Sequence, residues 1–394
     1  MNQISGQRLA EIGRLFFKLG VIGFGGPAAH IAMMEDEVVN RRQWLTAEKF
    51  LDLVGATNLI PGPNSTEMAI HVGYVYGGVL GLIVAGVCFI LPAVLITAFF
   101  GWIYVAFGQL PQVEPLLYGI KPAVLAVILA ALWRLGKKAI KSRQLLMVAI
   151  ATGIAVGLGL NEVLALLLGG VLGALWLNWN TRGIQGAIAA FPIPILLSQK
   201  PIAGEPFGLW KLGLLFLKVG SVLFGSGYVL IAFLEGGLVE EKGWLTQQQL
   251  LDAIAIGQFT PGPVLSTATF IGYIIAGIPG AIVATVGIFL PSFLFVLLLE
   301  TLIPRLRGWK WTAGFLDAVN VSAVALMAVV TLQLGKIALW RGTIETPVGV
   351  LPAVDGVALA IAAIAAILAI RWRVNAAWLV LGGAVVGFLL NSVI

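Results

Sequence analysis

An internal duplication restricts the fold of this chain more than any other feature of its sequence. Residues 15–63 recur as residues 215–263, with charged and polar positions repeated in register among the apolar ones. Chance similarity between two apolar stretches does not reproduce charged positions. The repeated residues include Lys18/Lys218, Glu35/Glu235, Trp44/Trp244, Asp52/Asp252 and, at the end of the match, Pro61-Gly62-Pro63 with Pro261-Gly262-Pro263. We therefore expect two copies of one unit, at residues 1–179 and 208–394, joined by a cytoplasmic linker at 180–207.

The composition indicates where such a unit can fold. Hydrophobic residues make up 59% of the 394-residue chain and charged residues only 11%, whereas a soluble domain carries about 25% charged residues. A water-soluble protein of this size cannot cover its surface with so few charges. A soluble enzyme and a nucleic-acid-binding protein are therefore excluded, and the sequence predicts a multi-pass protein embedded in a lipid bilayer.

Each repeat contains five long apolar segments and one pair of short segments around its Pro-Gly-Pro. The short segments are residues 46–58 and 64–77 in the first repeat, and 246–259 and 264–276 in the second. Each has about 13 or 14 residues, fewer than the roughly 20 that a spanning helix needs, and Pro-Gly-Pro cannot continue a helix. We expect a re-entrant helical hairpin whose tip lies inside the membrane; the alternative is a helix pair outside it.

Loop charges indicate how the two repeats are oriented. Five spans per repeat, an odd number, require the second repeat to be inverted, and basic residues alternate between corresponding loops as inversion demands. The basic stretch 134–143 of the first repeat and the pair Arg371 and Arg373 of the second are both expected in the cytoplasm. The predicted fold class is an all-α polytopic membrane protein of two inverted-topology repeats, with about ten spanning helices plus two re-entrant helical hairpins.

The two hairpin tips form the candidate binding site. In inverted repeats the tips approach each other near the middle of the membrane, and the helix after each tip directs its unpaired N–H groups into the space between them. Helix N-termini flanked by hydroxyl groups bind anions, and we expect a tetrahedral oxyanion. The candidate substrate-binding residues are Lys18, Gly25, Gly26, Pro61, Gly62, Pro63, Asn64, Ser65, Thr66, Lys218, Gly225, Ser226, Pro261, Gly262, Pro263, Ser266 and Thr267.

Charged residues inside the apolar segments have several interpretations. For Lys18 and Lys218 there are three. They line the path of the anion, they pair with Asp52 and Asp252, or they extend their charged ends to the membrane surface. The two aspartates are also candidate proton-coupling residues. Glu67 and His71 are two more: they lie four residues apart on one helical face of the first repeat only, where the alternative role is a helix-end interaction.

Patterns typical of catalysis or of cofactor binding are absent from the sequence. The chain has two histidines and one cysteine, too few for a metal site of ordinary ligand spacing, and no nucleophile–base pair is evident. We expect a protein that is not an enzyme and that needs no cofactor and no metal. An anion channel and a membrane-embedded enzyme acting on lipids are the two rival function classes.

The motifs Phe24-Gly25-Gly26-Pro27, Trp44-Leu45 and Pro61-Gly62-Pro63, with their second copies, resemble the chromate ion transporter family, in its long two-domain form. The resemblance implies a secondary transporter in the bacterial plasma membrane that exports chromate by alternating access and gives chromate resistance. It leaves proton coupling open, and sulfate or another oxyanion is the alternative substrate. The second copy departs at Gly225-Ser226-Gly227 and at Val264-Leu265. The glycine-rich helix faces also leave room for a homodimer.

Overall fold

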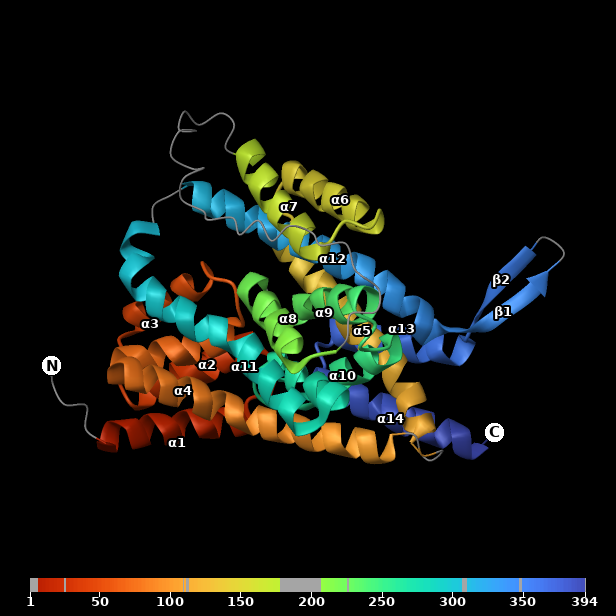
Figure 1. The fold of residues 1–394 in the computed structure, drawn as a ribbon, viewed down its shortest axis with the longest axis horizontal. Helices are drawn as coiled ribbons and strands as arrows, with labels where there is room; N and C mark the ends of the chain where they lie inside the picture. The colour runs from red at the N-terminus through yellow and green to blue at the C-terminus, as the bar shows by residue number, and fades with distance from the viewer. Residues whose placement is uncertain are drawn as a thin grey trace.

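The structure, a computed structural model, describes residues 6–24, 26–108, 110, 113–177, 207–224, 227–306, 310–346 and 349–393. The expected linker therefore lies almost entirely outside the described residues, as do Gly25, Gly225 and Ser226. The two repeats have the same order of helices in the part that is described (Figure 1).

The first repeat begins with a helix that breaks and resumes. Its elements are α1 (Gly6–Ile22), α2 (Pro27–Glu35), a π-helical turn (Asp36–Arg41), α3 (Ala47–Thr57), α4 (Asn64–Phe107), α5 (Glu114–Ala139), α6 (Arg143–Gly157) and α7 (Glu162–Leu177). Helix α3 starts where the sequence predicts, because the Thr46 hydroxyl accepts a hydrogen bond from the Lys49 backbone N–H.

The second repeat follows the same order with one addition. Its elements are α8 (Leu209–Val222), a 3-10 turn (Gly227–Val229), α9 (Leu230–Leu234), a π-helical turn (Glu235–Glu241), α10 (Gln247–Phe259), a 3-10 turn (Val264–Ser266), α11 (Thr267–Leu306), α12 (Lys310–Leu339), β1 (Trp340–Thr346), β2 (Gly349–Val354), α13 (Gly356–Arg371) and α14 (Ala376–Val393). The antiparallel pair β1 and β2 is a departure from the all-α prediction, which left this stretch as a loop between helices.

Helices α4 and α11 each consist of two helices joined at a sharp elbow. The backbone leaves the helical conformation at Gly77 and Gly78 in α4, and at Ala276 and Gly277 in α11. Gly78 and Gly277 have φ of 59° and 62°, values that glycine adopts without steric cost. Each elbow thus separates a short helix after the Pro-Gly-Pro from a long apolar one, close to the boundary predicted from the sequence.

Close glycine contacts hold the two arms of each elbow together. A Cβ atom at Gly73 would collide with the carbonyl oxygen of Gly81, and one at Gly272 would collide with that of Gly280. The backbones of the two arms therefore touch directly, as small residues allow between packed helices.

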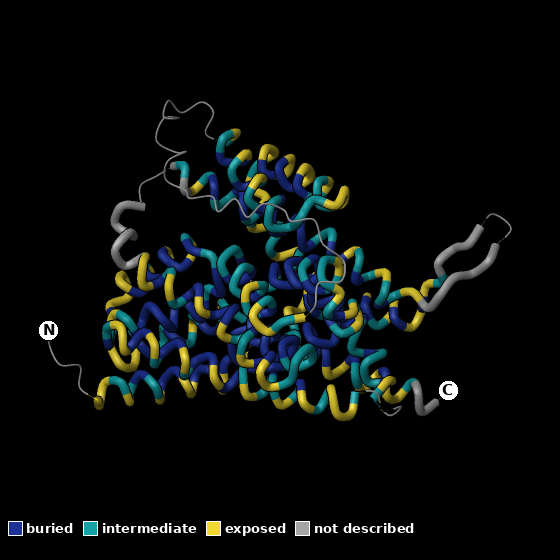
Figure 2. Tube along the Cα trace, in the orientation of Figure 1, coloured by how far each residue is buried: buried dark blue, intermediate teal, exposed yellow. Residues whose placement is uncertain are grey.

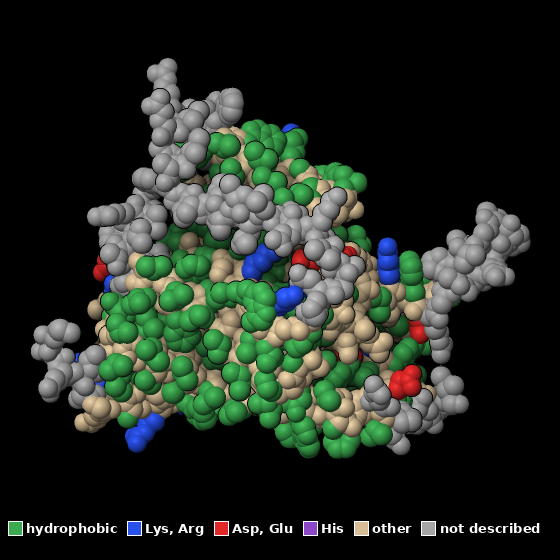
Figure 3. Space-filling view, in the orientation of Figure 1, with side chains coloured by type: hydrophobic (Ala, Val, Ile, Leu, Met, Phe, Trp, Pro, Cys, Tyr) green, Lys and Arg blue, Asp and Glu red, His purple; other side chains and the backbone are tan. Residues whose placement is uncertain are grey.

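The helices of the two repeats pack against one another. Helix α4 packs on α11, and α5 packs on α12, α13 and α14, while α6 and α7 pack on α12 at the top of Figure 1. Buried residues gather inside this assembly (Figure 2). Large apolar side chains remain exposed around it, for example Leu95, Phe99, Ile282 and Leu332, and hydrophobic side chains dominate the face seen in Figure 3.

An apolar exterior of this kind fits a lipid environment. Four helices of the described chain are long and apolar enough to cross a membrane: Asn64–Phe107, Glu114–Ala139, Val264–Leu298 and Ala313–Leu339. Four more apolar helices, Arg143–Gly157, Glu162–Leu177, Gly356–Arg371 and Ala376–Leu390, are shorter. The fold is therefore that of a helical membrane protein, and the number of ten spans stays a prediction.

The elbow packing can be tested with one methyl group. Gly73→Ala places a Cβ against the Gly81 backbone and should lower stability by about 1–3 kcal/mol, the usual cost of overpacking. Gly157→Ala is the control, since a Cβ there meets nothing within 4 Å. Thermal unfolding of the detergent-purified proteins gives the comparison, and equal melting temperatures for Gly73→Ala and the wild type would contradict the packing.

Candidate functional site

The two hairpin tips are bound by the opposite repeats. The Gly62 N–H donates a 2.7 Å hydrogen bond to the Leu223 carbonyl, and the Gly262 N–H donates a 2.7 Å hydrogen bond to the Gly23 carbonyl. Gly23 and Leu223 occupy equivalent positions, at the break after α1 and the break after α8. Each tip thus supplies the hydrogen-bond partner that the broken helix of the other repeat needs.

Glycine is required at both tips. Gly62 has φ of 141° and Gly262 has φ of 87°, conformations that other residues rarely adopt. A Cβ atom at Gly62 would also collide with the Glu67 carboxylate, and one at Gly262 would lie 3.0 Å from the Ala93 side chain. The predicted tip residues Gly62 and Gly262 are therefore positioned by backbone conformation and by packing together.

The first tip encloses a buried polar cluster around Glu67. The Glu67 side chain is completely buried, and neither of its oxygens has a hydrogen-bond partner in the described part of the chain. It lies beside Gly62 and near Ser292 of α11. The hydroxyls of Thr66 and Ser292 are also buried without a partner among the described residues, and so is that of Ser266 beside the second tip. At the second tip Ala93 takes the place of Ser292, because Ala93 follows Pro92 as Ser292 follows Pro291.

Glu67 and His71 are both fully buried on α4. Glu67 makes no hydrogen bond to His71, since neither carboxylate oxygen is bonded within the described chain. The structure brings the two predicted proton-coupling residues to one side of the first tip without joining them directly.

The space between the two tips is nearly closed. A cavity of about 10 Å³ is lined by Pro63 and Ser65 of the first tip and by Val264 and Leu265 of the second. Such a volume holds at most one water molecule, which needs about 10–15 Å³. An oxyanion fits between the tips only when they separate.

Several predicted ligand groups are used within their own repeat. The Asn64 side chain donates a 2.8 Å hydrogen bond to Asn58, and the Thr267 hydroxyl donates one of 2.8 Å to the Val264 carbonyl. Pro61, Pro261 and Pro263 belong to the tip loops, and the Gly26 backbone has φ of 83° directly before α2.

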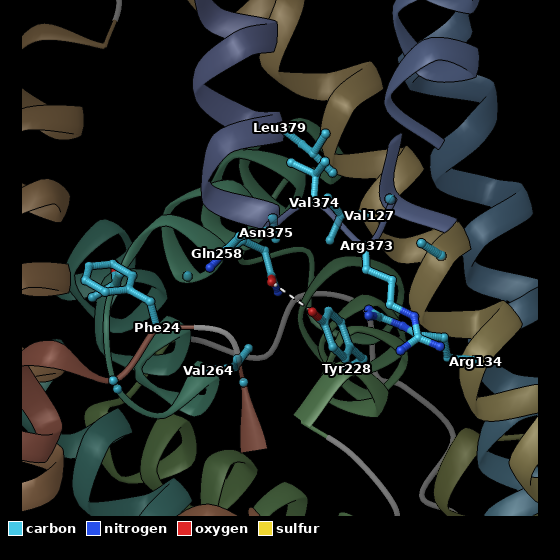
Figure 4. Close-up of a pocket in the computed structure, with 18 residues that line it drawn as sticks. Phe24, Val127, Arg134, Tyr228, Gln258, Val264, Arg373, Val374, Asn375 and Leu379 are labelled. Atoms are coloured by element: carbon cyan, nitrogen blue, oxygen red, sulfur yellow. Dashed lines mark hydrogen bonds between the residues drawn. The ribbon is translucent and has the colours of Figure 1, made fainter. Parts of the chain in front are cut away.

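A much larger cavity, of about 200 Å³, opens beside the second tip (Figure 4). Gly262 and Thr260 of the tip line it, together with Gly23 and Gly26 of the break after α1. Helix α5 contributes Arg134, and the turn between α13 and α14 contributes Arg373. The sequence predicts a cytoplasmic position for both arginines but gives no sign that they line the same cavity.

Tyr228 separates the open cavity from the space between the tips. Tyr228 and Val264 line both cavities. The Tyr228 hydroxyl donates a 3.0 Å hydrogen bond to the Gln258 side-chain oxygen, drawn as a dashed line in Figure 4. The Gln258 amide nitrogen has no acceptor in the described structure.

Lys18 is paired away from the tips. Its ammonium group lies 2.7 Å from the Glu37 carboxylate, which Arg42 also contacts at 3.2 Å. The hydrogen bond from Lys18 lowers the pKa of Glu37, and Arg42 adds to the effect. In the second repeat Gly237 stands at the position of Glu37, and Lys218 has no carboxylate partner within the described ranges. The two repeated lysines therefore have different environments.

The repeated aspartates also differ. Asp252 is buried and accepts a 2.8 Å hydrogen bond from the Tyr104 hydroxyl of the first repeat. Asp52 is only partly buried on α3. Neither aspartate lines the two cavities described above.

Sequence reasoning missed His30, Gln258 and the pairing of the two arginines. The His30 Nε2 lies 2.9 Å from the Gly23 carbonyl, so this oxygen accepts from both His30 and Gly262. A buried histidine next to a predicted break was the available signal. No sequence pattern joins Arg134 to Arg373, because the packing of α5 on α13 brings them together.

These features define an integral membrane protein in which broken helices and hairpin tips of the two repeats are hydrogen-bonded to each other. Broken helices at a repeat interface are found in transporters. The chain belongs to the chromate transporter family, whose profile matches residues 10–174 and 210–388. The predicted family is thereby confirmed, and the two matched segments fall in the two repeats.

Relatives of both full and half length are similar to the chain. It is 34% identical to the chromate transport protein of Cupriavidus metallidurans, over 87% of this chain and 86% of that protein. It is 32% identical to the probable chromate transport protein of Synechococcus elongatus, over 83% and 85%. An uncharacterized transporter of Bacillus subtilis, YwrA, is 31% identical over 36% of this chain and 79% of its own length. No solved structure matches the chain.

The ion pair of Lys18 predicts a pH-dependent contribution to stability. Lys18→Gln should lower the free energy of unfolding at pH 7 by about 0.2–1 kcal/mol, because Lys18 is half exposed. The lowered pKa of Glu37 makes this contribution fully present above the ordinary glutamate pKa of about 4.3. It disappears as the pH falls through the lowered value.

Thermal unfolding of wild type and Lys18→Gln between pH 7 and pH 3 measures the difference. Lys218→Gln is the matched control, because Gly237 offers it no carboxylate. A loss for Lys218→Gln equal to that for Lys18→Gln, or a loss that does not shrink at low pH, would refute the assignment.

Proposed function

We propose that this protein is a secondary transporter that exports chromate across the bacterial plasma membrane by alternating access and so gives chromate resistance. Membership of the chromate transporter family supports the substrate, and so does the similarity to the chromate transport protein of Cupriavidus metallidurans. The observation that carries the mechanism is the reciprocal pair of hydrogen bonds from Gly62 to Leu223 and from Gly262 to Gly23. Two equivalent contacts of this kind can exchange open and closed states on opposite sides of one site.

The inverted arrangement of the repeats is part of this proposal. The first repeat, residues 1–179, and the second, residues 208–394, exchange equivalent contacts in the manner of a two-fold axis. Arg134 of α5 and Arg373 of the turn after α13, which inversion places on one side of the membrane, line one cavity. The half-length match to YwrA agrees with a unit of one repeat.

The substrate crosses where the two tips meet. The tips are in contact around a space of about 10 Å³, while the cavity on the side of the basic loops has about 200 Å³. We propose that this conformation is open to the cytoplasm and that the tips part to admit the oxyanion. An inside-negative potential of 100 mV favours the exit of a dianion by about 4.6 kcal/mol, so export needs no other driving ion.

Proton coupling, if it accompanies this export, depends on Glu67. A completely buried carboxylate without a partner among the described residues is costly in its ionised form. We propose that Glu67 is uncharged in this conformation and releases its proton when the first tip opens, with His71 as the neighbouring acceptor. Asp52 and Asp252 remain secondary candidates.

The alternatives differ in what they require of the tips. Sulfate has the charge and shape of chromate, so another oxyanion carrier is the nearest rival. An anion channel needs an open pore at the tips, and the small volume there favours a carrier.

A homodimer stays a prediction. The relatives named as transport proteins agree with a protein that is not an enzyme.

Flux in sealed vesicles tests the proposed function. Labelled chromate should leave right-side-out vesicles under an inside-negative potential. Unlabelled sulfate should slow this efflux to the extent that it binds at the same site. A superimposed pH gradient reports proton coupling. No movement of chromate in vesicles of either orientation, with the protein shown to be folded, would reject chromate transport.

Glu67→Gln tests proton coupling separately. The amide keeps the shape of the neutral acid and cannot release a proton, so chromate flux at equal pH should persist while its response to a pH gradient disappears. Glu48→Gln, on the exposed side of α3, is the control and should keep the response. A Glu67→Gln protein with the full pH-gradient response would exclude Glu67 as the coupling residue.

A further inference from the structure

We infer that the large cavity beside the second tip is an oxyanion-binding site in which Arg134 and Arg373 bind the charge and the Gln258 amide donates to an oxygen of the ligand. The inference rests on the proposed function for its biological ligand. Its physical basis is the set of groups that line the cavity, none of which was among the substrate-binding residues predicted from the sequence except the two glycines Gly26 and Gly262.

The cavity carries two positive charges and no negative one. Arg134 and Arg373 both line it, and no Asp or Glu is found among its described lining residues. Neither guanidinium forms an ion pair within the described ranges. Two like charges at one cavity repel each other unless an anion lies between them, and two guanidinium forks match a dianion in charge and in hydrogen-bond geometry.

The backbone at Arg373 is fixed in an uncommon conformation. Arg373 has φ of 55°, in the left-handed region that few non-glycine residues occupy. Figure 4 shows the Arg134 side chain, from α5, and the Arg373 side chain, from the turn before α14, lying close together beside Tyr228. Residues held in such conformations gather at binding sites, which fits a side chain positioned for a ligand.

Exposure decreases along the cavity. Arg134 and Arg373 are exposed, whereas Gln258 and Thr260 have 9% and 6% of their surfaces accessible. An anion attracted by the arginines therefore moves from solvent toward a buried end formed by Gln258 and the second tip. About 200 Å³ admits a tetrahedral oxyanion with some of its water.

The buried end offers donors. The Gln258 amide nitrogen lacks an acceptor in the described structure, and its oxygen is already bonded to Tyr228. The Asn375 side-chain oxygen accepts from the Ala377 N–H. Both amide oxygens of the lining thus already accept one hydrogen bond, whereas the Arg134 and Arg373 guanidinium groups and the Gln258 amide nitrogen supply N–H donors. A lining in which cationic N–H donors predominate favours a fully deprotonated oxyanion, chromate or sulfate, over hydrogen phosphate, which also carries a hydrogen-bond donor.

Equilibrium binding of labelled sulfate and chromate to the full-length protein in nanodiscs tests this site. Arg134→Gln and Arg373→Gln should each weaken binding about tenfold or more, because each removes a charge-assisted hydrogen bond. Arg371→Gln is the matched control: Arg371 is an exposed arginine at the end of α13, two residues before Arg373, and does not line the cavity. Hydrogen phosphate should compete at least tenfold less well than sulfate at pH 7.

Two additional variants separate binding from folding. Arg134→Lys and Arg373→Lys keep the positive charge but lose the two parallel N–H donors of the guanidinium group. Their affinities for the oxyanion should lie between those of wild type and the Gln variants. Unliganded melting temperatures equal to wild type show that the fold is intact. Equal affinity of wild type and both Gln variants, or a wild type that binds no oxyanion, would overturn the site.

The binding assay and the flux assay can fail independently. Arginine-dependent sulfate and chromate binding without any flux would reject the proposed transport and support the site. Chromate flux that is unchanged in both Gln variants would support transport and reject the site.

Discussion

Two backbone hydrogen bonds, one from each Pro-Gly-Pro tip, hold the center of this molecule together. In a medium without water an unpaired peptide group costs several kcal/mol, so a broken helix needs a partner from elsewhere. Gly62 and Gly262 supply it across the repeats. The breaks and the tips must therefore recur together, and moving one tip changes the surroundings of the opposite break. This reciprocity makes alternating access a natural proposal for a member of the chromate transporter family.

The two repeats differ in the buried polar residues next to their tips and helix breaks. Glu67 faces Ser292 at the first tip, whereas Ala93 faces the second. His30 supports the first break, and Leu230 stands at its position in the second repeat. Under the functions proposed above, the first tip binds a proton and the second borders the site for the anion. Tyr228 lies on the boundary between them, lining both cavities.

The local features of the fold were predictable from the sequence, and the contacts between distant segments were not. Capping by Thr46 and the Pro-Gly-Pro loops fix where α3 and α4 begin, and the duplication gives the second repeat by analogy. The pairing of Lys18 with Glu37 could have been suspected from the sequence, because Glu37 is replaced by Gly237 in the second repeat. Arg134 and Arg373, by contrast, meet through the packing of α5 and α13, which no periodicity within either helix encodes. The strands β1 and β2 were missed because Arg341, Gly342 and Glu345, between two apolar helices, are residue types typical of a loop.

The cross-repeat hydrogen bonds also impose an order on synthesis. When the first repeat has been made, the Gly23 carbonyl and the Gly62 N–H still lack the partners that Gly262 and Leu223 provide. At ribosomal rates of about 5–20 residues per second, Gly262 follows Gly23 only after roughly 10–50 seconds. During that interval the Gly23 carbonyl can still accept from His30, but the Gly62 N–H needs water or another acceptor. Membrane insertion and completion of the fold are therefore separate events in this chain, and the second depends on its last half.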